Sequence, residues 1–382
     1  VFVPFFTRSM VYTMPEFLER RYNPQSRTIL SVISLVSYVL TKVAVTVYAG
    51  GLVFQQVFGI KELWGIDSFW IAAIGLVVLT ALYTIFGGMK SVLYTSVLRT
   101  PILLLGSLII LVLGFKELGG WDEMMRVCGA VTVNDYGDTM TNLIRSNDDA
   151  TFPWLGALIG SAIIGFWYWC TDQFIVQRVL SGKNEMEARR GTIFGAYLKL
   201  LPVFLFLIPG MIAFALHQKY IGAGGEGFLP MLENGTANAD AAFPTLVAKL
   251  LPAGVKGLVV CGILAALMSS LASLFNSSAM LFTIDFYKRF RPQTSEKKLV
   301  GIGQVATVVI VILGILWIPI MRSVGDVLYT YLQDVQSVLA PGIAAAFLLG
   351  ICWKRTSAQG GMWGLISGMV IGLTGLGAKV YY

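Results

Sequence analysis

The sequence predicts an all-α polytopic membrane protein, and composition is the first reason. Of its 382 residues, 56% are hydrophobic and 13% are charged, against roughly 25% charged residues in an average soluble domain. The mean hydropathy is +0.74. Apolar stretches of about 20 residues, the length that crosses a bilayer core about 30 Å thick, recur along the chain. Each should be a helix, because an open strand cannot satisfy its backbone groups in lipid.

The apolar stretches predict a partial span at residues 1–13 and nine further spans. These lie near 29–53, 66–87, 92–114, 154–178, 191–216, 254–286, 299–321, 327–352 and 358–378. Two longer connections, near 115–153 and 217–253, have room for short helices. We assign residues 1–382 to a single transmembrane domain. The chain starts and stops beside apolar stretches, so we expect it to be an interior piece of a longer protein.

Basic residues indicate how the spans are oriented. Lysine and arginine concentrate in alternate connections, such as 178–190 and 288–298, whereas acidic residues gather in the connection near 115–153. By the positive-inside rule, the basic connections are cytoplasmic and the two longer ones lie outside. Loop topology therefore accounts for the net charge of +7, and we expect no nucleic-acid partner. The predicted location is the cell membrane, crossed several times, with the lipid bilayer as a partner.

Cysteine and histidine usage excludes several kinds of site. Cys128, Cys170, Cys261 and Cys352 form no CxxC pair, and His217 is the only histidine. The sequence therefore indicates neither a zinc site nor a disulfide framework. No Ser-His-Asp arrangement can be assembled around this one histidine, which argues against an enzyme.

Charged residues inside the predicted spans are the first candidates for function. Lys42, Arg99 and Lys199 are the basic ones, and Asp172 and Asp334 are the acidic candidates. A charge at mid-membrane costs a few kcal/mol, so each needs a partner, a water-filled cavity or a function. Arg99 lies near a cytoplasmic helix end and could snorkel to the interface. For Lys42 and Lys199 we favour a polar cavity over a structural ion pair.

A stripe of small polar residues follows one helical face. Ala266, Ser269, Ser270 and Ser273 are spaced three or four residues apart, so they share that face. Serine hydroxyls and a backbone carbonyl are hard oxygen ligands that suit Na⁺. The alternative is a stripe of small residues that lets two helices pack closely. Spacing alone favours close packing.

Two further clusters have the chemistry to bind a sugar. The segment Phe166–Gln173 places bulky aromatic rings beside Asp172, and such rings either stack on a sugar or fill a core or interfacial belt. Tyr329 and Gln333 are one helical turn apart. The Gln333 amide suits a neutral polyhydroxylated ligand, and a bond to a neighbouring helix is about equally consistent with the sequence.

Together these segments resemble the sodium/solute symporter family, and within it the sodium–glucose cotransporter branch. The resemblance covers nearly the whole chain and rests above all on Trp-Tyr-Trp-Cys-Thr-Asp-Gln at 167–173 and Met-Ser-Ser-Leu-Ala-Ser at 268–273. It implies a five-plus-five inverted-repeat, leucine-transporter-like bundle with a midplane site and alternating access. The bundle is expected to be incomplete, because the family's first core helix and C-terminal helices are not found in this sequence.

The resemblance also implies roles for single residues. A coupling Na⁺ would be held by Ala266, Ser269 and Ser270. The substrate residues implied are Lys42, Tyr168, Trp169, Lys199, Tyr329 and Gln333. Ser96 stands where relatives commonly carry aspartate, and Ala272 where two-sodium members carry threonine, which predicts one Na⁺ per sugar.

The sequence thus predicts a sodium-coupled secondary active symporter that imports a hexose such as glucose or galactose. One alternative is a symporter of the same fold for myo-inositol or another small solute. The other is a sugar sensor or sodium-leak channel that carries no substrate.

Overall fold

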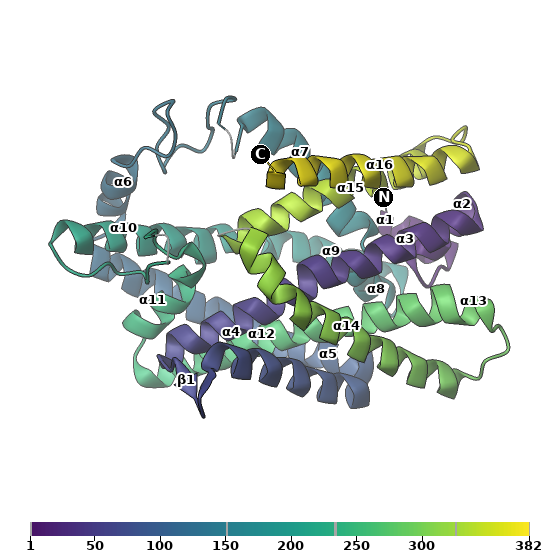
Figure 1. Cartoon of the computed structure of the whole chain (residues 1–382), viewed down its shortest axis with the longest axis horizontal. Helices are drawn as coiled ribbons and strands as arrows, with labels where there is room; N and C mark the ends of the chain where they lie inside the picture. Colours follow the sequence, from purple (N-terminus) through teal and green to yellow (C-terminus); the bar gives the residue numbers. More distant parts are fainter. Residues whose placement is uncertain (1, 150–151, 233–234, 325–326, 382) are drawn as a thin grey trace.

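The computed structural model describes residues 2–149, 152–232, 235–324 and 327–381. For 85–93, 95, 98, 321–324, 376, 377 and 379–381 it describes the backbone alone. Nearly all of the regular structure is helical (Figure 1). The described residues contain one two-stranded hairpin, in which β1 (Glu62–Leu63) pairs antiparallel with β2 (Ile66–Asp67).

Most of the helices follow one another with short connections. The first half contains α1 (Phe2–Ser9), α2 (Met14–Arg21), α3 (Pro24–Ser37), η1 (Tyr38–Val43), α4 (Ala44–Phe58), α5 (Ser68–Leu118), α6 (Trp121–Gly129), α7 (Trp154–Phe166), η2 (Trp167–Thr171), α8 (Gln173–Leu180) and α9 (Glu185–Leu198). The second half contains η3 (Val203–Leu207), α10 (Ile208–Gly222), η4 (Ala239–Ala241), α11 (Ala242–Leu250), α12 (Ala253–Met280), η5 (Leu281–Tyr287), α13 (Lys288–Phe290), α14 (Glu296–Val324), α15 (Leu328–Cys352) and α16 (Ala358–Tyr381).

Among the described residues, seven helices are long and apolar enough to cross a membrane. They are Pro24–Phe58, Arg99–Leu118, Trp154–Thr171, Glu185–Gly222, Ala253–Phe290, Glu296–Ile320 and Leu328–Cys352. A shorter apolar helix, Ser68–Thr84, lies at the predicted span 66–87, and α16 covers the predicted span 358–378. Each of the nine predicted spans therefore coincides with a helix. The two longer connections hold short helices as expected, with α6 in the first and α11 in the second.

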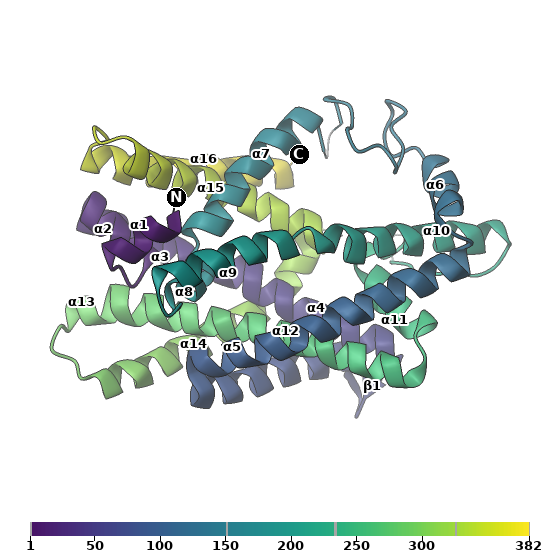
Figure 2. The same cartoon turned by 180° about the vertical axis from the view of Figure 1, so that it is seen from behind.

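The predicted spans 66–87 and 92–114 imply a turn near 88–91, and that prediction is wrong because the helix continues through it. The backbone of α5 is helical for 51 residues without interruption, and a straight helix of that length would measure about 76 Å. Its two legs instead fold back past one another (Figure 2). Tyr83 on the first leg and Ser96 on the second both bond to one turn of α12, at Met268 and Ser269. The two spans remain, but a bent helix joins them.

Local sequence sets where several helices begin. The Asn23 side chain accepts a hydrogen bond from the Ser26 N–H, and Pro24 takes the first position of α3. Thr13 caps α2 and Asp172 caps α8 in the same way. These side chains satisfy backbone donors that a helix start leaves open.

Four of the helical segments are π-helices: η1, η2, η3 and η5. A π turn inserts an extra residue into the hydrogen-bond ladder and is frequent at functional sites. Lys42 lies in η1, and Tyr168 and Trp169 lie in η2. Both turns therefore carry residues that the sequence predicts to bind substrate.

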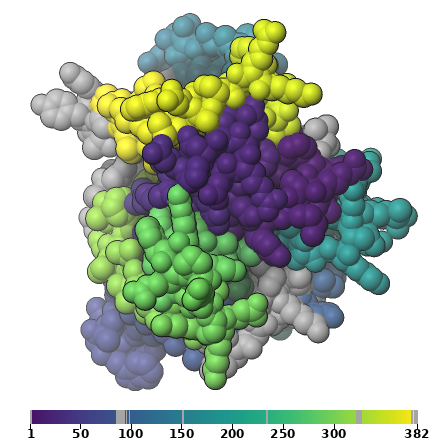
Figure 3. Space-filling view, turned by 90° about the vertical axis from the view of Figure 1, so that its right-hand side faces the viewer, coloured from purple at the N-terminus to yellow at the C-terminus, as the bar shows by residue number. Residues whose placement is uncertain are grey.

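Two clusters of buried apolar residues hold the helices together. The larger joins α1–α4, η1, the first leg of α5, η2, α8, α12, η5, α14, α15 and α16. The smaller joins the second leg of α5 to α6, α10, α11 and the start of α12. Figure 1 shows α6, α10 and α11 at one end of the molecule and α2 and α13 at the other. At that other end the N-terminal helices lie between α16 and the green segment that includes α13 (Figure 3).

Candidate functional site

Lys42 forms an ion pair with Asp172, across 130 residues of sequence. Its side chain is buried, as is that of Asp172. The carboxylate also accepts the Tyr38 hydroxyl at 2.8 Å and the Phe174 N–H at 3.1 Å. Because Asp172 begins α8, the positive end of the helix dipole helps to hold its charge. The interpretation favoured for Lys42, an open polar cavity, is therefore wrong in this structure, where a paired carboxylate meets the ammonium group.

Several aromatic rings lie close to the Lys42 ammonium. Nζ lies 4.6 Å from the Phe174 ring centroid, 4.7 Å from that of Tyr38 and 5.2 Å from that of Tyr168. Rings at these distances attract a cation through their negative faces, and the effect grows when water is removed. The charge is thus held by one carboxylate and a cage of rings at the junction of η1 and η2.

Lys199 belongs to the same chain of contacts. Its Nζ lies 4.8 Å from the Trp169 ring centroid, and the Trp169 and Tyr168 rings meet edge to face at 5.2 Å. Lys199 is exposed and the Trp169 side chain is 49% exposed. The structure therefore brings four of the predicted substrate residues together, from buried Lys42 through Tyr168 and Trp169 to Lys199 at the surface.

Tyr329 and Gln333 form a second group on α15. The Gln333 amide donates to the Tyr329 hydroxyl at 3.2 Å. Helix α15 packs against both η1 and η2, so this pair lies on an element next to the Lys42 cage. Among the described residues, the Gln333 side chain bonds to Tyr329 alone.

The serine stripe faces the second leg of α5. The hydroxyls of Ser269 and Ser96 are 3.0 Å apart, and the Ser269 side chain is buried. The Ser270 hydroxyl donates to the Ala266 carbonyl oxygen at 3.0 Å. The three residues predicted to hold Na⁺ therefore lie within one turn of α12, at its contact with α5.

Arg99 bonds to the backbone of α12. One guanidinium nitrogen, Nη1, donates to the carbonyl oxygens of Ala265 at 3.0 Å and Ala266 at 2.8 Å. Arg178 of α8 donates to the hydroxyl of Ser273, the next serine along the stripe. Two cations therefore reach the face that carries the predicted sodium ligands.

Two groups of residues escaped the sequence prediction. Tyr38 bridges Asp172 and the Phe174 N–H, and its only sequence signal is its place one turn before Lys42. Asp285 is buried and accepts the hydroxyls of Thr13 and Ser31 and the guanidinium of Arg27. Thr13 caps α2, and Arg27 and Ser31 lie on α3, whereas Asp285 lies in η5, so nothing in its local sequence reveals the cluster.

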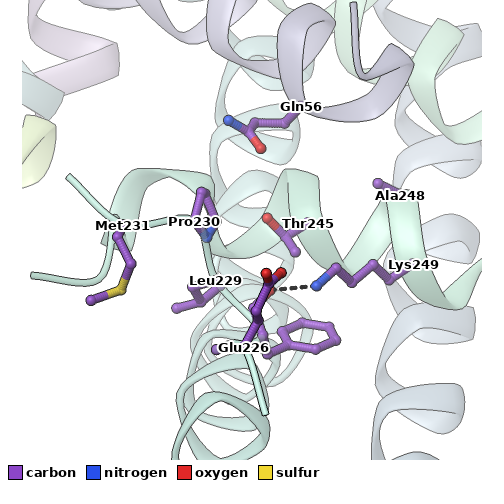
Figure 4. Close-up of a pocket in the computed structure, with 10 residues that line it drawn as sticks. Gln56, Glu226, Leu229, Pro230, Met231, Thr245, Ala248 and Lys249 are labelled. Carbon is purple, nitrogen blue, oxygen red and sulfur yellow. Dashed lines mark hydrogen bonds between the residues drawn. The ribbon is translucent and has the colours of Figure 1, made fainter. Parts of the chain in front are cut away.

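Two open pockets lie away from the predicted residues. A pocket of about 490 Å³ opens between α11, the end of α4 and the connection 226–231, with Lys249 donating to the Phe228 carbonyl oxygen at 2.8 Å (Figure 4). A second pocket of about 300 Å³ lies between α1, α8 and Met280. No residue predicted for the substrate or Na⁺ lines either of these pockets.

Comparison with known proteins identifies the family. A model of the sodium:solute symporter family matches residues 1–368. The chain is 37% identical to sodium/myo-inositol cotransporter 2 of Homo sapiens, covering 98% of this chain and 56% of that protein. It is 39% identical to sodium/mannose cotransporter SLC5A10 of Bos taurus and 37% identical to sodium/glucose cotransporter 4 of Mus musculus. Each of these two matches covers 98% of this chain, with 64% and 55% of the relative.

A solved structure shares the fold. It is a Na⁺-coupled sialic acid symporter in a substrate-bound outward-open state, with a TM-score of 0.72 and 21% identity over 99% of this chain and 79% of that one. This likeness confirms the expected all-α bundle of five-plus-five inverted-repeat type, in a multi-pass membrane protein. The chain spans about half to two thirds of the length of the relatives named above. A family match over nearly all of its residues shows that the chain belongs to the sodium:solute symporter family.

Proposed function

We propose that this protein is a sodium-coupled secondary active symporter that imports a neutral sugar by alternating access, with one Na⁺ per sugar. Residues 1–382 would act in it as one transmembrane domain. Family membership supports sodium coupling, and three of its relatives are named as cotransporters of myo-inositol, mannose and glucose. The substrate classes in those names are polyhydroxylated and uncharged.

The Lys42 cage is the observation that carries the proposal. A buried ammonium held by one carboxylate and several rings keeps a strong donor inside the helix bundle. Beside it, the Tyr168 and Trp169 rings offer faces on which the apolar side of a sugar ring stacks. In the proposed site, Lys42, Lys199 and Gln333 bond to sugar hydroxyls, Tyr168 and Trp169 close over the ring, and Tyr329 lines the wall.

The serine stripe supports the sodium part of the proposal. Ala266, Ser269 and Ser270 supply a carbonyl and two hydroxyl oxygens within one turn of α12, and hard oxygen ligands suit Na⁺. Binding of Na⁺ between α12 and α5 would favour the conformation that accepts sugar, which is positive coupling between two ligands. Each inward charge then gains about 2.3 kcal/mol per 100 mV of membrane potential.

Uptake into proteoliposomes tests the function directly. The full-length protein would be reconstituted and given labelled glucose, galactose, mannose or myo-inositol, with an inward Na⁺ gradient or with choline in place of Na⁺. We expect one of these solutes to accumulate against its gradient only when Na⁺ is present. Sodium currents without accumulation would favour the leak-channel alternative, and binding with neither would favour a sensor.

A symporter for myo-inositol is the second candidate. Sodium/myo-inositol cotransporter 2 from Homo sapiens is 37% identical to this chain, as close as the glucose cotransporter named above. A competition series with unlabelled glucose and myo-inositol against the transported solute separates the two candidates. The better competitor at equal concentration identifies the substrate.

Substitution of Ser269 tests the sodium assignment. In Ser269→Ala one oxygen ligand is lost, so the half-saturating Na⁺ concentration for uptake should rise about tenfold, which corresponds to 1.4 kcal/mol. Expression and the maximal rate at saturating Na⁺ should change little. Ser367→Ala on exposed α16 is the matched control. Unchanged Na⁺ affinity in Ser269→Ala would contradict the assignment.

A further inference from the structure

We infer that Arg99 is a tethered cation that competes with Na⁺ for the carbonyl oxygen of Ala266. The inference rests on the proposed sodium site and goes beyond it, because it assigns a protein side chain to the ion's own ligand. Sodium would then bind only when the Arg99 guanidinium withdraws from α12.

The hydrogen bonds of the Ala266 carbonyl carry the inference. Within α12 this oxygen accepts the N–H four residues on. It also accepts the Ser270 hydroxyl at 3.0 Å and Arg99 Nη1 at 2.8 Å. A carbonyl oxygen has two lone pairs, so three donors leave it no capacity for a metal ion.

The other predicted ligands are engaged in the same arrangement. The Ser269 hydroxyl lies 3.0 Å from that of Ser96, which is one turn before Arg99 on the same leg of α5. The Ser270 hydroxyl points its proton at Ala266. Arg99 and Ser96 thus contact the same turn of α12. The Arg99 guanidinium occupies the position of the proposed Na⁺ ion.

The charges around Arg99 favour competition over simultaneous binding. Among the described residues, the ionisable groups that act on Arg99 are the Arg178 guanidinium and the Tyr83 hydroxyl, and neither is a carboxylate. Arg178 itself donates to Ser273, one turn further along the stripe. A Na⁺ ion added between two guanidinium groups would be repelled by both, since like charges repel strongly at low dielectric.

Competition has a quantitative consequence. The apparent dissociation constant of a ligand equals its intrinsic value divided by the fraction of protein that is free to bind. If Arg99 holds the Ala266 carbonyl nine tenths of the time, its removal should lower the half-saturating Na⁺ concentration about tenfold. Tighter Na⁺ binding in Arg99→Gln would exclude a merely structural arginine, whose removal would weaken the site. Tighter binding in Arg99→Lys, which keeps the positive charge, would separate competition for the carbonyl from repulsion by charge alone.

Three variants of the full-length protein test this. Arg99→Gln removes the charge, and Arg99→Lys keeps the charge without the planar group. Lys116→Gln, at the exposed far end of α5, removes the same charge away from α12. Binding would be followed as the thermal shift caused by NaCl, with choline chloride as the salt control, so that no transport step is needed. We expect about a tenfold lower half-saturating Na⁺ for Arg99→Gln, a smaller decrease for Arg99→Lys and none for Lys116→Gln.

The outcomes separate this inference from the proposed function. If Ser269→Ala abolishes the Na⁺ response while both Arg99 variants keep the wild-type half-saturating concentration, the sodium site stands and competition by Arg99 is overturned. If Ser269→Ala leaves the response intact, the sodium site is misassigned and the inference falls with it. Should Arg99→Gln fail to fold, Arg99→Lys alone decides between these results.

Discussion

Single residues around Lys42 and Asp172 stabilise the two buried charges. The Asp172 carboxylate pairs with the Lys42 ammonium and accepts hydrogen bonds from a hydroxyl and a backbone N–H. Aromatic rings lie close to the ammonium. Such a pair adds little net stability to the fold. Removal of one partner leaves the other charge buried and unpaired, which lowers the free energy of unfolding by about 3–5 kcal/mol. The arrangement therefore maintains charge and geometry at the centre of the fold.

A double-mutant cycle tests this account. Lys42→Met leaves Asp172 unpaired, so we expect the free energy of unfolding to fall by about 3–5 kcal/mol. Lys42→Met combined with Asp172→Asn removes both charges and should recover most of that loss. The measurement is denaturant unfolding of the purified protein in detergent.

A control comes from an exposed ion pair on α6. Arg126 bonds to Glu123 at the surface, so Arg126→Met should leave unfolding nearly unchanged. If Lys42→Met were as harmless as Arg126→Met, the pair would not be the structural centre that its burial indicates.

The sequence could predict the residue types at this site but not their pairing. Tyr168, Trp169 and Asp172 stand in one short segment, so their proximity follows from the chain itself. Lys42 lies 130 residues away from Asp172, and only the packing of η1 on η2 brings the two together. Arg99 was harder still, because its partners are backbone carbonyls, which every residue has and no sequence pattern marks.

At the scale of helices, the apolar stretches of the sequence located each of the nine predicted spans. Length and hydropathy suffice for this because lipid requires each crossing to be a helix of about 20 apolar residues. The join between 66–87 and 92–114 was predicted wrongly as a turn, since two separate apolar stretches of membrane-crossing length fit there. The backbone stays helical there, and Gly87 and Gly88 fall among the residues for which only the backbone is described.

Helices α15 and α16 contact one another at Gly342 and Gly368. A substitution can test whether this close contact stabilises the protein. A Cβ at Gly368 would lie 2.5 Å from the Gly342 Cα, a backbone atom that cannot move aside cheaply. Close approach of small residues stabilises helix pairs in lipid, where no hydrophobic force acts between helices. We expect Gly368→Ala to destabilise the protein by about 1–3 kcal/mol, as overpacking does.

The matched control is on the same helix. A Cβ at Gly364 meets no atom within 4 Å, so Gly364→Ala should be neutral or slightly stabilising. Thermal unfolding and protease cleavage between α15 and α16 would measure both variants. Equal behaviour of the two alanines would argue that the glycine contact does not hold α16 in place.

At the scale of the whole molecule, the two ends of the bundle are held in different ways. The end with α6, α10 and α11 has its own apolar core. The opposite end, which the positive-inside rule places in the cytoplasm, is held by Asp285, on which α3, η5 and the cap of α2 converge. In the proposed alternating-access cycle this inner end would separate, and a polar cluster opens to water at lower cost than an apolar core does.

Asp285→Asn tests whether this cluster holds the inner end closed. The amide keeps the size of the carboxylate but loses the charge that binds Arg27, an interaction worth about 1.5–3 kcal/mol for a charged hydrogen bond. Hydrogen exchange at the amides of α2 and η5 should therefore become at least about tenfold faster, since 1.4 kcal/mol corresponds to tenfold. Exchange in α10 and α11 should stay at the wild-type rate, because their core lies at the other end.

Asp122→Asn, at an exposed position of α6, is the control for loss of an acidic charge. Faster exchange at both ends would indicate general unfolding, and unchanged exchange in α2 would show that Asp285 does not hold the inner end closed.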